Sequence, residues 1–267
     1  MLENNKRVTI YDIINKKSVQ PIVMITAYDA LFARFFDDYA DIILVGDSLN
    51  MSFNGKKDTL SPKMNDALYH VKAVLQGAKR AFVVADMPFG SYFSEKDALK
   101  NAAKFIKAGA DAVKFEGGLK AAPIVKRLAS EGINVMAHIG LMPQFVRNEG
   151  GYKIKGHSEA DEARLIEEAQ ALEHAGAFSA VLEGTVSSVA AKVAKSVKMP
   201  IIGIGAGVDV DGQVLVWSDM LGFFDEFKPK FVKRYLDGAN LVRTAVEAYA
   251  REVREKTFPS EEFEYKI

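Results

Sequence analysis

The chain between residues 94 and 116 reads SEKDALKNAAKFIKAGADAVKFE. Ser94 comes before an acidic turn, and a hydroxyl cap followed by negative charge is typical of the electropositive start of a helix. Gly109 ends the helical pattern, because glycine readily takes the left-handed conformation that closes a helix. The apolar run Ala112–Phe115 follows, with the β-branched and aromatic content of a buried strand. This stretch therefore predicts a helix followed by a strand that is covered on both faces.

The same alternation runs along the whole chain. Eight short apolar runs are predicted to be strands: Ile22–Thr26, Ile42–Val45, Phe82–Ala85, Ala112–Phe115, Val135–Ala137, Ala180–Leu182, Ile201–Ile204 and Gln213–Trp217. Amphipathic stretches between them are predicted to be helices, among them Lys63–Lys79, Glu95–Ala108, Ala121–Glu131, Ala160–Ala175 and Ser187–Val197. Gly132 and Gly176 follow helical runs, as Gly109 does. Strands that alternate with helices indicate either a barrel or a doubly wound sheet.

Two features favour the barrel. The number of strands is eight, and no glycine-rich dinucleotide fingerprint follows the first strand, where the chain reads Thr26-Ala27-Tyr28-Asp29. No change of composition marks a second domain. We therefore expect the α/β class and a single-domain (β/α)8 TIM barrel over residues 1–267, with an N-terminal extension and a charged C-terminal tail, Glu255–Ile267.

The composition narrows the possible functions. The 267 residues include 35 Lys plus Arg and 35 Asp plus Glu, so the chain has no net charge, which argues against nucleic acid or an anionic membrane as a partner. Because the net charge is zero, electrostatic repulsion between copies of the chain is small and self-association is allowed. The absence of cysteine excludes disulfides, thiolate metal sites and a cysteine nucleophile. No membrane-spanning apolar run and no signal peptide are apparent, so we expect a cytoplasmic protein.

Ionisable residues end five consecutive predicted strands. Strands two to six end, in order, in Asp47, Asp86, Glu116, His138 and Glu183. Lys114 is two positions before Glu116 and so points to the same face of its strand. Barrel enzymes carry their catalytic residues at this end of the strands, and we therefore expect one shared active site.

The three carboxylates of Asp47, Asp86 and Glu116 predict a divalent metal. Brought together, they would repel and raise one another's pKa values unless a cation offsets them, and oxygen ligands suit Mg²⁺. The alternative is that a single aspartate after a strand caps the next helix, and that Glu183 is only a salt-bridge partner. Glycines at 203–207 favour either phosphate binding or a tight turn. His70 and His174 are expected to be structural or exposed, and residues 140–158 to form a loop over the site.

Nine segments, in order along nearly the whole chain, are similar to the ketopantoate hydroxymethyltransferase family of the phosphoenolpyruvate/pyruvate-type barrel superfamily. They are TAYD (26–29), VGDSL (45–49), VADMPFGSY (84–92), VKFEGG (113–118), HIGLMPQ (138–144), GGY (150–152), LE (182–183), IGIGAG (202–207) and DGQVLV (211–216). Each segment is ordinary by itself, and the ordered set is specific.

The resemblance implies a reaction. The family transfers a hydroxymethyl group from 5,10-methylenetetrahydrofolate to 3-methyl-2-oxobutanoate through a Mg-stabilised enolate, and forms 2-dehydropantoate (ketopantoate) in pantothenate biosynthesis. By resemblance, Asp47 and Asp86 bind Mg²⁺, with Glu116 in or just behind the metal shell, and Glu183 accepts the proton. By resemblance, Ser48 and Lys114 contact the keto acid, and Asp47 and Asp86 are expected beside it as metal ligands. His138 is a candidate to orient the substrate by its position alone. The resemblance also implies a homo-oligomer, a decamer.

Two single positions and two short stretches depart from the family pattern. Asn50 and Val208 stand where glycine and proline are common, and 60–62 and 184–186 also differ. None of these differences removes a metal ligand or the base named above. They are therefore expected to affect the geometry of the loops and the affinity for folate, and not the type of reaction. Three rival functions remain open: a Mg-dependent lyase or mutase of the same superfamily, a non-catalytic barrel that binds a metabolite, and a phosphosugar enzyme that uses the glycines after the seventh strand.

Overall fold

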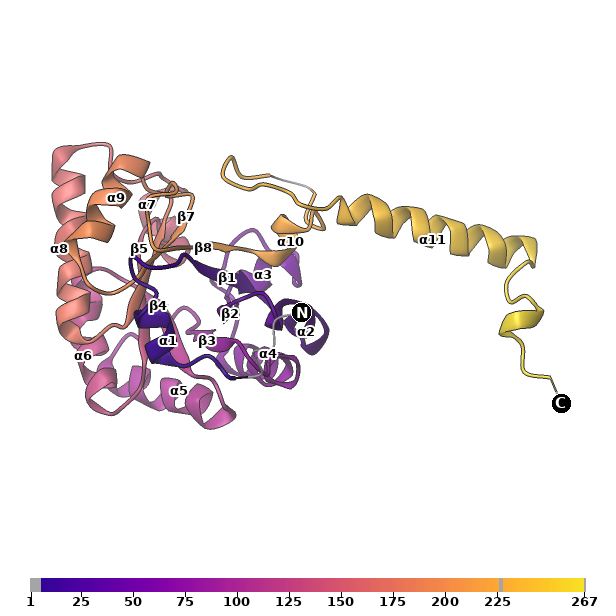
Figure 1. The fold of residues 1–267 in the computed structure, drawn as a ribbon, viewed down its shortest axis with the longest axis horizontal. Helices are drawn as coiled ribbons and strands as arrows, with labels where there is room; N and C mark the ends of the chain where they lie inside the picture. Colours follow the sequence, from indigo (N-terminus) through magenta and orange to yellow (C-terminus); the bar gives the residue numbers. More distant parts are fainter. Residues whose placement is uncertain (1–5, 226–227, 267) are drawn as a thin grey trace. The chain divides into compact units, whose positions relative to one another are not determined.

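The computed structural model describes residues 6–225 and 228–266. Within them, eight parallel strands close into a barrel in which each strand pairs with the next and β8 pairs with β1 (Figure 1). The strands are β1 (Ile22–Thr26), β2 (Ile42–Val45), β3 (Phe82–Asp86), β4 (Ala112–Glu116), β5 (Val135–Gly140), β6 (Ser179–Glu183), β7 (Ile201–Ile204) and β8 (Gly212–Leu215). The predicted (β/α)8 TIM barrel is confirmed.

Helices form the outer layer of the barrel. They are α2 (Ala30–Asp37), α3 (Leu49–Ser52), α4 (Met64–Gly77), α5 (Glu95–Ala108), α6 (Ala122–Ser130), α7 (Val146–Glu149), α8 (Glu159–Ala175) and α9 (Ser187–Ser196), with the 3-10 turns η1 (Leu119–Ala121) and η2 (Pro143–Phe145). All five helices predicted by range are present. The Ser94 side chain accepts a hydrogen bond of 3.1 Å from the Asp97 backbone N–H, and Gly109 ends α5 with φ of 111°.

Two details of the prediction are wrong. The last strand was expected at Gln213–Trp217, but β8 ends at Leu215, where its pairing with β1 ends, and Trp217 begins α10 (Trp217–Met220). The Trp217 ring packs on Phe223, which follows α10, with ring centroids 5.5 Å apart. The apolar residue at 217 therefore packs a helix against the segment after it and does not extend the strand. Strict alternation also fails, because residues 205–211 join β7 directly to β8 without a helix.

The chain divides into two compact units, Met1–Val216 and Trp217–Ile267. The first holds the barrel. The second holds α10, the long helix α11 (Gly238–Glu255) and the 3-10 turn η3 (Glu261–Phe263). The expectation of one domain over residues 1–267 stays a prediction, and residues 1–5 of the expected N-terminal extension lie outside the described part. No helix in the described residues is long and apolar enough to cross a membrane.

The barrel is filled by side chains that alternate along the strands. Ile22 and Met24 of β1, Phe82 and Val84 of β3 and Ala112 of β4 belong to one buried cluster. Val8 and Ile13, from the chain before β1 and from α1 (Ile10–Ile14), join this cluster next to the amino-terminal ends of the strands. Because alternate residues face inward, this pattern also turns Asp86, Lys114 and Glu116 toward the barrel interior.

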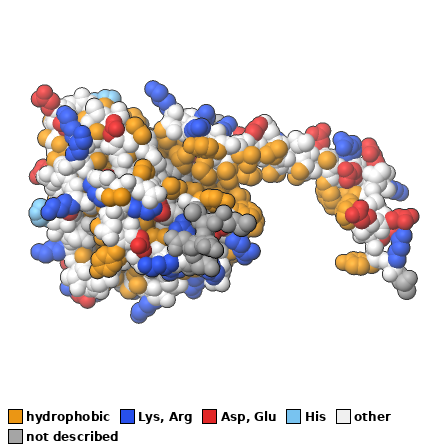
Figure 2. All heavy atoms as spheres, viewed as in Figure 1, with side chains coloured by type: hydrophobic (Ala, Val, Ile, Leu, Met, Phe, Trp, Pro, Cys, Tyr) orange, Lys and Arg blue, Asp and Glu red, His pale blue; other side chains and the backbone are white. Residues whose placement is uncertain are grey.

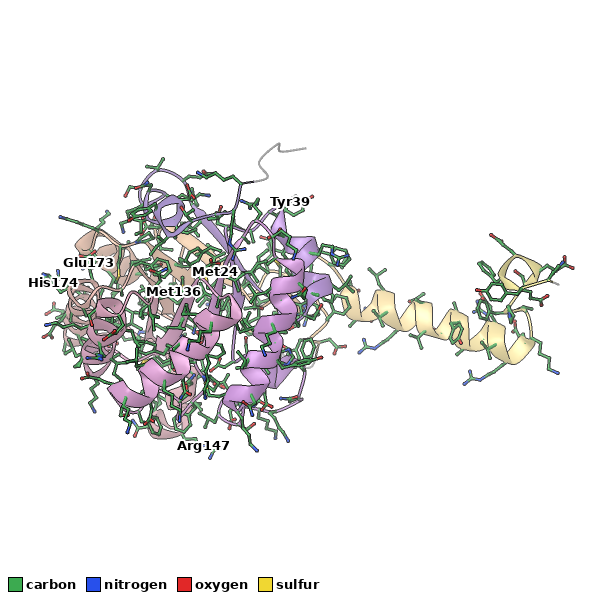
Figure 3. All side chains as sticks on the ribbon, turned by 90° about the horizontal axis from the view of Figure 1, so that it is seen from below. Met24, Tyr39, Met136, Arg147, Glu173 and His174 are labelled. Atoms are coloured by element: carbon green, nitrogen blue, oxygen red, sulfur yellow. The ribbon has the colours of Figure 1, made fainter. Side chains whose placement is uncertain are left out.

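Side-chain placement agrees with the burial pattern. Met24 and Met136 lie inside the barrel, whereas Tyr39, Arg147 and His174 lie at its surface (Figure 3). His174 was expected to be structural or exposed, and it is exposed.

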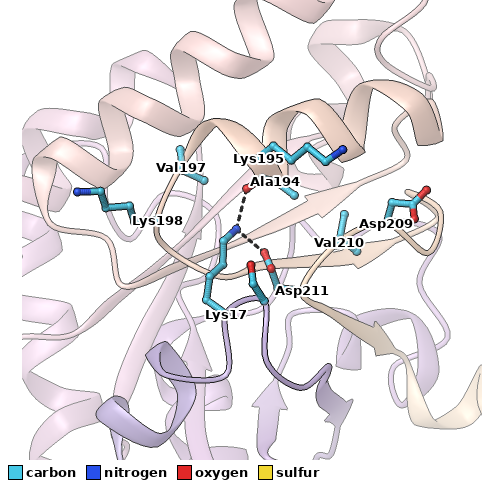
Figure 4. Close-up of a pocket in the computed structure, with 9 residues that line it drawn as sticks. Lys17, Ala194, Lys195, Val197, Lys198, Asp209, Val210 and Asp211 are labelled. Atoms are coloured by element: carbon cyan, nitrogen blue, oxygen red, sulfur yellow. Dashed lines mark hydrogen bonds and ion pairs between the residues drawn. The ribbon is translucent and has the colours of Figure 1, made fainter.

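A pocket of about 620 Å³ lies at the amino-terminal ends of β1, β7 and β8 (Figure 4). Inside it, Lys17 Nζ donates to the Ala194 carbonyl at 2.7 Å and pairs with Asp211 Oδ2 at 2.6 Å. The same Asp211 oxygen accepts the Ile201 backbone N–H at 2.9 Å. These contacts tie the segment before β1 to α9 and β7, at the end of the barrel opposite to the predicted active site.

Candidate active site

The predicted site residues meet at the carboxyl ends of β2 to β6. The strand register sets Asp86 beside Lys114, Glu116 beside His138 and Gly140 beside Glu183. The residues Asp47, Asp86, Lys114, Glu116 and His138 are all buried. The side chain of Glu183 is 18% exposed, so it is the member of the group most open to solvent. The sequence therefore identified residues that the fold does bring together.

Asp47, Asp86 and Lys114 form one contact group. The Asp47 backbone N–H donates to Asp86 Oδ2 at 3.3 Å, and Lys114 Nζ lies 2.7 Å from Asp86 Oδ1. Asp47 follows β2 in the turn 46–48, whereas Asp86 and Lys114 lie on the neighbouring strands β3 and β4. The pairing of these neighbouring strands thus holds the Asp86 carboxylate in contact with the Lys114 ammonium and with the backbone of Asp47.

The pKa values of this group are shifted by burial and by the crowding of like charges. Burial and then the nearby Asp86 raise the pKa of Asp47 to about 7, against the opposing effect of Lys114. Burial and then Asp47 hold the pKa of Glu116 well above its usual range. Burial lowers the pKa of Lys114, but the surrounding carboxylates, first Asp86, outweigh it and leave that pKa raised. With all groups ionised, three carboxylates and one ammonium leave a formal charge of −2.

This charge and donor chemistry fit Mg²⁺. In the described part of the chain no three acidic or histidine side chains are arranged as one metal-binding group. Mg²⁺ does not require such a group, since it usually binds through one or two carboxylates and keeps several waters. Asp47 and Asp86 supply two hard oxygen donors on adjacent strand ends, and they are the residues that suit the ion.

Glu116 is held by other partners. Its Oε2 accepts the Gln144 backbone N–H at 2.9 Å, and its Oε1 lies 3.8 Å from His138 Nδ1. These contacts favour a position for Glu116 behind the Asp47–Asp86 pair.

His138 links Lys114 to Glu183. Its Nε2 lies 3.0 Å from the Leu141 carbonyl, which can only accept, so Nε2 carries a hydrogen. Its Nδ1 lies 3.4 Å from Lys114 Nζ, which can only donate, so Nδ1 is the acceptor. These two contacts fit the tautomer that carries its hydrogen on Nε2. That N–H also faces Glu183 Oε2 at 3.4 Å.

The alternative role of helix cap applies to Asp29 and not to Asp47. Asp29 accepts the Leu31 and Phe32 backbone N–H groups at 2.8 and 2.9 Å and so caps α2. Asp47 instead accepts from the Gln144 side chain. Ser48 precedes α3 without a capping bond from its side chain, and its Oγ lies 2.7 Å from the Tyr28 hydroxyl. Asp47 and Ser48 therefore face the site rather than serve the helix.

Three residues near the site had no role assigned from the sequence. Tyr28 is fully buried against Ser48, and its carbonyl lies 2.7 Å from His70 Nδ1, which fits a structural role for His70. Tyr92 and Gln144 are bonded to each other at 2.5 Å. Burial and then Glu116 raise the pKa of Tyr92, so its hydroxyl stays a donor. All three lie in the segments that resemble the family, and that was the available signal.

The long connection after β5 is more ordered than a plain loop. It contains η2 and α7, and its residue Lys155 donates its backbone N–H to the Gly184 carbonyl at 2.8 Å. This bond fastens the segment beside Glu183. After β7, a side chain at Gly207 would lie 2.5 Å from the Ser187 Cβ atom, which supports close packing as the reason for that glycine.

Comparisons with known proteins identify the family. The family model described as ketopantoate hydroxymethyltransferase matches residues 7–261. A protein of Campylobacter concisus (strain 13826), named 3-methyl-2-oxobutanoate hydroxymethyltransferase, is 67% identical over 98% of this chain and 97% of its own length. Proteins of the same name from Campylobacter curvus (strain 525.92) and Helicobacter pylori (strain Shi470) are 63% and 55% identical, over 100% and 96% of this chain and 100% and 95% of their own lengths.

Solved structures agree on the fold. A phosphonopyruvate hydrolase in complex with oxalate and Mg²⁺ has a TM-score of 0.64 at 13% identity, and the match covers 95% of this chain and 93% of that one. A 2,3-dimethylmalate lyase, described as a member of the PEP mutase/isocitrate lyase superfamily, has a TM-score of 0.58 at 15% identity over 96% and 91%. On the sequence matches, the chain belongs to the ketopantoate hydroxymethyltransferase family of transferases.

Proposed function

We propose that the chain forms 2-dehydropantoate by transfer of a hydroxymethyl group from 5,10-methylenetetrahydrofolate to 3-methyl-2-oxobutanoate. The observation that carries the proposal is the arrangement of the site. An acidic pair and an ammonium lie at the ends of β2 to β4, and a carboxylate lies at the end of β6, across the eight-stranded barrel from β2. An α-keto acid between them would have an anion-binding group on one side and a base on the other.

Lys114 and Ser48 are suited to hold the keto acid. The Lys114 ammonium is buried and offers a charge-assisted hydrogen bond to the substrate carboxylate. The Ser48 hydroxyl is oriented by Tyr28 and can donate or accept. Mg²⁺ bound by Asp47 and Asp86 would supply positive charge next to the keto oxygen, where negative charge develops when the proton leaves.

Glu183 is the proposed base. Its carboxylate takes the proton from C3 of the keto acid, and the electron pair of the broken C–H bond forms the enolate. The Nε2–H group of His138 faces Glu183 at 3.4 Å and orients it without competing for that proton. C3 then attacks the methylene carbon of the folate iminium, and water replaces the folate nitrogen to give the hydroxymethyl group and tetrahydrofolate.

Exposed aromatic side chains support a flat second substrate. Phe53, Phe89 and Phe93 follow β2 and β3, and Tyr152 follows β5, so all four lie on connections at the carboxyl ends of the strands. Such rings offer a stacking surface to the pteridine of the folate.

We also propose a homo-oligomer. Val23 on β1 is 45% exposed, and α11 has an exposed apolar row (Leu241, Val242, Val246, Tyr249 and Val253). Hydrophobic side chains lie along this helix among charged ones (Figure 2). Contiguous apolar surface of this kind is typical of protein contacts. The decamer stays an expectation from the family resemblance.

Two assays test the chemistry. The chain with Mg²⁺ should exchange the C3 proton of 3-methyl-2-oxobutanoate with solvent deuterium, and should form ketopantoate only when methylenetetrahydrofolate is added. Glu183→Gln should slow the exchange by about 10²-fold or more, since it removes the base, and should leave Mg-dependent binding of the keto acid intact. Exchange at the wild-type rate in this variant would reject Glu183 as the base, and turnover without folate would favour a lyase or mutase.

A further inference from the structure

Gln144 contacts two buried carboxylates of the site, those of Asp47 and Glu116. It lies on η2, after β5, and is 3% exposed. Its side-chain Nε2 donates to Asp47 Oδ2 at 2.8 Å, and its backbone N–H donates to Glu116 Oε2 at 2.9 Å. One residue on a connecting segment therefore holds acids that come from the ends of β2 and β4.

The orientation of the Gln144 amide is fixed by its neighbours. Nε2 also donates to the Met87 carbonyl at 3.1 Å, and Oε1 accepts the Tyr92 hydroxyl at 2.5 Å. A flipped amide would set its oxygen against the Asp47 carboxylate and the Met87 carbonyl, two groups that only accept. Tyr92 is buried and comes from the segment after β3. The hydroxyl of Tyr92 thus completes a chain of contacts from β3 through Gln144 to Asp47.

These bonds restrict the carboxylate of Asp47. Without Gln144, the Asp47 side chain would lose the bond to its Oδ2 and keep Thr59 as a hydrogen-bond partner, so it would be held less firmly beside Asp86. With Oδ2 engaged, the carboxylate is held in one rotamer beside Asp86. A ligand that is already oriented loses less conformational freedom when a cation binds, so the cation binds more tightly.

We propose that Gln144 is a positioning residue that orients Asp47 for binding of a divalent cation, and that Tyr92 acts through Gln144 by fixing its amide. This inference rests on the proposed role of Asp47 and Asp86 as Mg²⁺ ligands. It gives the segment after β5 a second role, besides the stacking surface proposed for Tyr152.

The test measures Mg²⁺ affinity by titration calorimetry on the folded chain, without substrate turnover. Gln144→Met keeps the size of the side chain and the backbone bond to Glu116 but removes the amide, and it should weaken Mg²⁺ binding by about tenfold. Tyr92→Phe should weaken it by a smaller factor, about threefold. The double variant should bind no more weakly than Gln144→Met, because Tyr92 acts only through the amide. Purely structural damage at two sites would instead give additive losses.

Controls separate this inference from the proposed metal site. Gln170→Met, an exposed glutamine on α8, should leave Mg²⁺ affinity unchanged. Asp86→Asn is measured in parallel. If Asp86→Asn loses Mg²⁺ binding while Gln144→Met binds as the wild type does, or if the losses in the double variant add, the positioning role is wrong. If Asp86→Asn itself binds Mg²⁺ normally, the proposed metal site is wrong, and the role of Gln144 is rejected with it.

Discussion

Asp29 and Asp47 show how one residue type serves two purposes in the same fold. Each follows a strand and precedes a helix, so the local sequence alone permits a cap at both positions. Asp29 caps α2 with its carboxylate. Asp47 instead contacts Asp86 and Gln144 in the candidate site. The difference arises from their partners, which come from distant parts of the chain.

The buried acids should differ in their effect on metal binding. Asp86→Asn should weaken Mg²⁺ binding by more than tenfold, about 1.4 kcal/mol or more, because it removes a charged oxygen donor. Glu116→Gln should have a smaller effect, since Glu116 is engaged by Gln144 and lies near His138. Titration of each variant with Mg²⁺ gives the ranking, and an equal or reversed order would contradict the assignment of Asp86 as the direct ligand.

Asp219 should make stability depend on pH. Burial raises the pKa of Asp219 to about 6, with Arg234 opposing, so the fold favours its neutral form. That stabilisation is complete below the unfolded pKa of about 4 and is lost as the pH rises through about 6. Asp219→Asn should therefore raise the Tm at pH 7.5 and change it little at pH 4, with a gain of no more than about 1 kcal/mol because the side chain is partly exposed.

Thermal unfolding of the wild type and Asp219→Asn at the two pH values checks this. Asp209→Asn, at an exposed position, is the matched control and should give the same difference from wild type at both pH values. A gain for Asp219→Asn that is equal at pH 4 and pH 7.5 would show that ionisation is not its cause.

At the scale of elements, the junction of β5 and β6 sets the position of the base. Gly140 pairs with Glu183, and the Leu141 backbone N–H donates to the Glu183 carbonyl at 2.9 Å. The Gly140 backbone has φ of 89°, and a Cβ atom there would lie 2.3 Å from the Glu183 carbonyl oxygen. Glycine is therefore required for both its conformation and its size.

Gly140→Ala should separate the two strand ends. We expect a loss of stability of about 2–4 kcal/mol and a large decrease in C3 proton exchange, since Glu183 moves with β6. Gly132→Ala is the control: φ there is 77°, and nothing lies within 4 Å of the added Cβ atom, so only the backbone cost of about 1 kcal/mol applies. Chemical denaturation and the exchange assay test both variants. Equal losses in the two would mean that contact with Glu183 does not matter.

At the scale of the whole molecule, the barrel unit and the second unit differ in how they bury their apolar side chains. The barrel unit buries its apolar side chains in a closed interior. Helix α11 leaves an apolar row exposed, with Val246 59% and Tyr249 58% exposed. A long helix with such a row is seldom stable by itself in water, because most helix stability comes from packing of the apolar face.

Disruption of that row should reduce self-association. Val246→Glu places a charge in the apolar row and should lower the molar mass measured by light scattering after size-exclusion chromatography. Arg251→Gln changes the opposite face of α11 and should leave the mass unchanged. The same mass in Val246→Glu and wild type, or a monomeric wild type, would contradict the proposed role of this surface.

The sequence by itself determined the barrel and which ionisable residues lie together at the ends of its strands. Its apolar runs were long enough, and its caps and glycines strong enough, to locate all eight strands, and alternation placed Lys114 and Glu116 on one face. The end of β8 was misplaced because a buried tryptophan in a helix and one in a strand have the same local pattern. The missing helix between β7 and β8 had no signal other than the short spacing of the two strands.

Tertiary structure alone decided which partners meet. The contacts of Gln144 with Asp47, Tyr92 and Glu116 join residues 28 to 97 positions apart, and the Tyr28 contact with Ser48 joins residues 20 positions apart. The tautomer of His138 likewise follows from Lys114 and Leu141. Sequence periodicity reports which way a side chain points, because that depends on neighbours a few residues away. Which carboxylate is oriented, and by what, depends on the closure of the barrel.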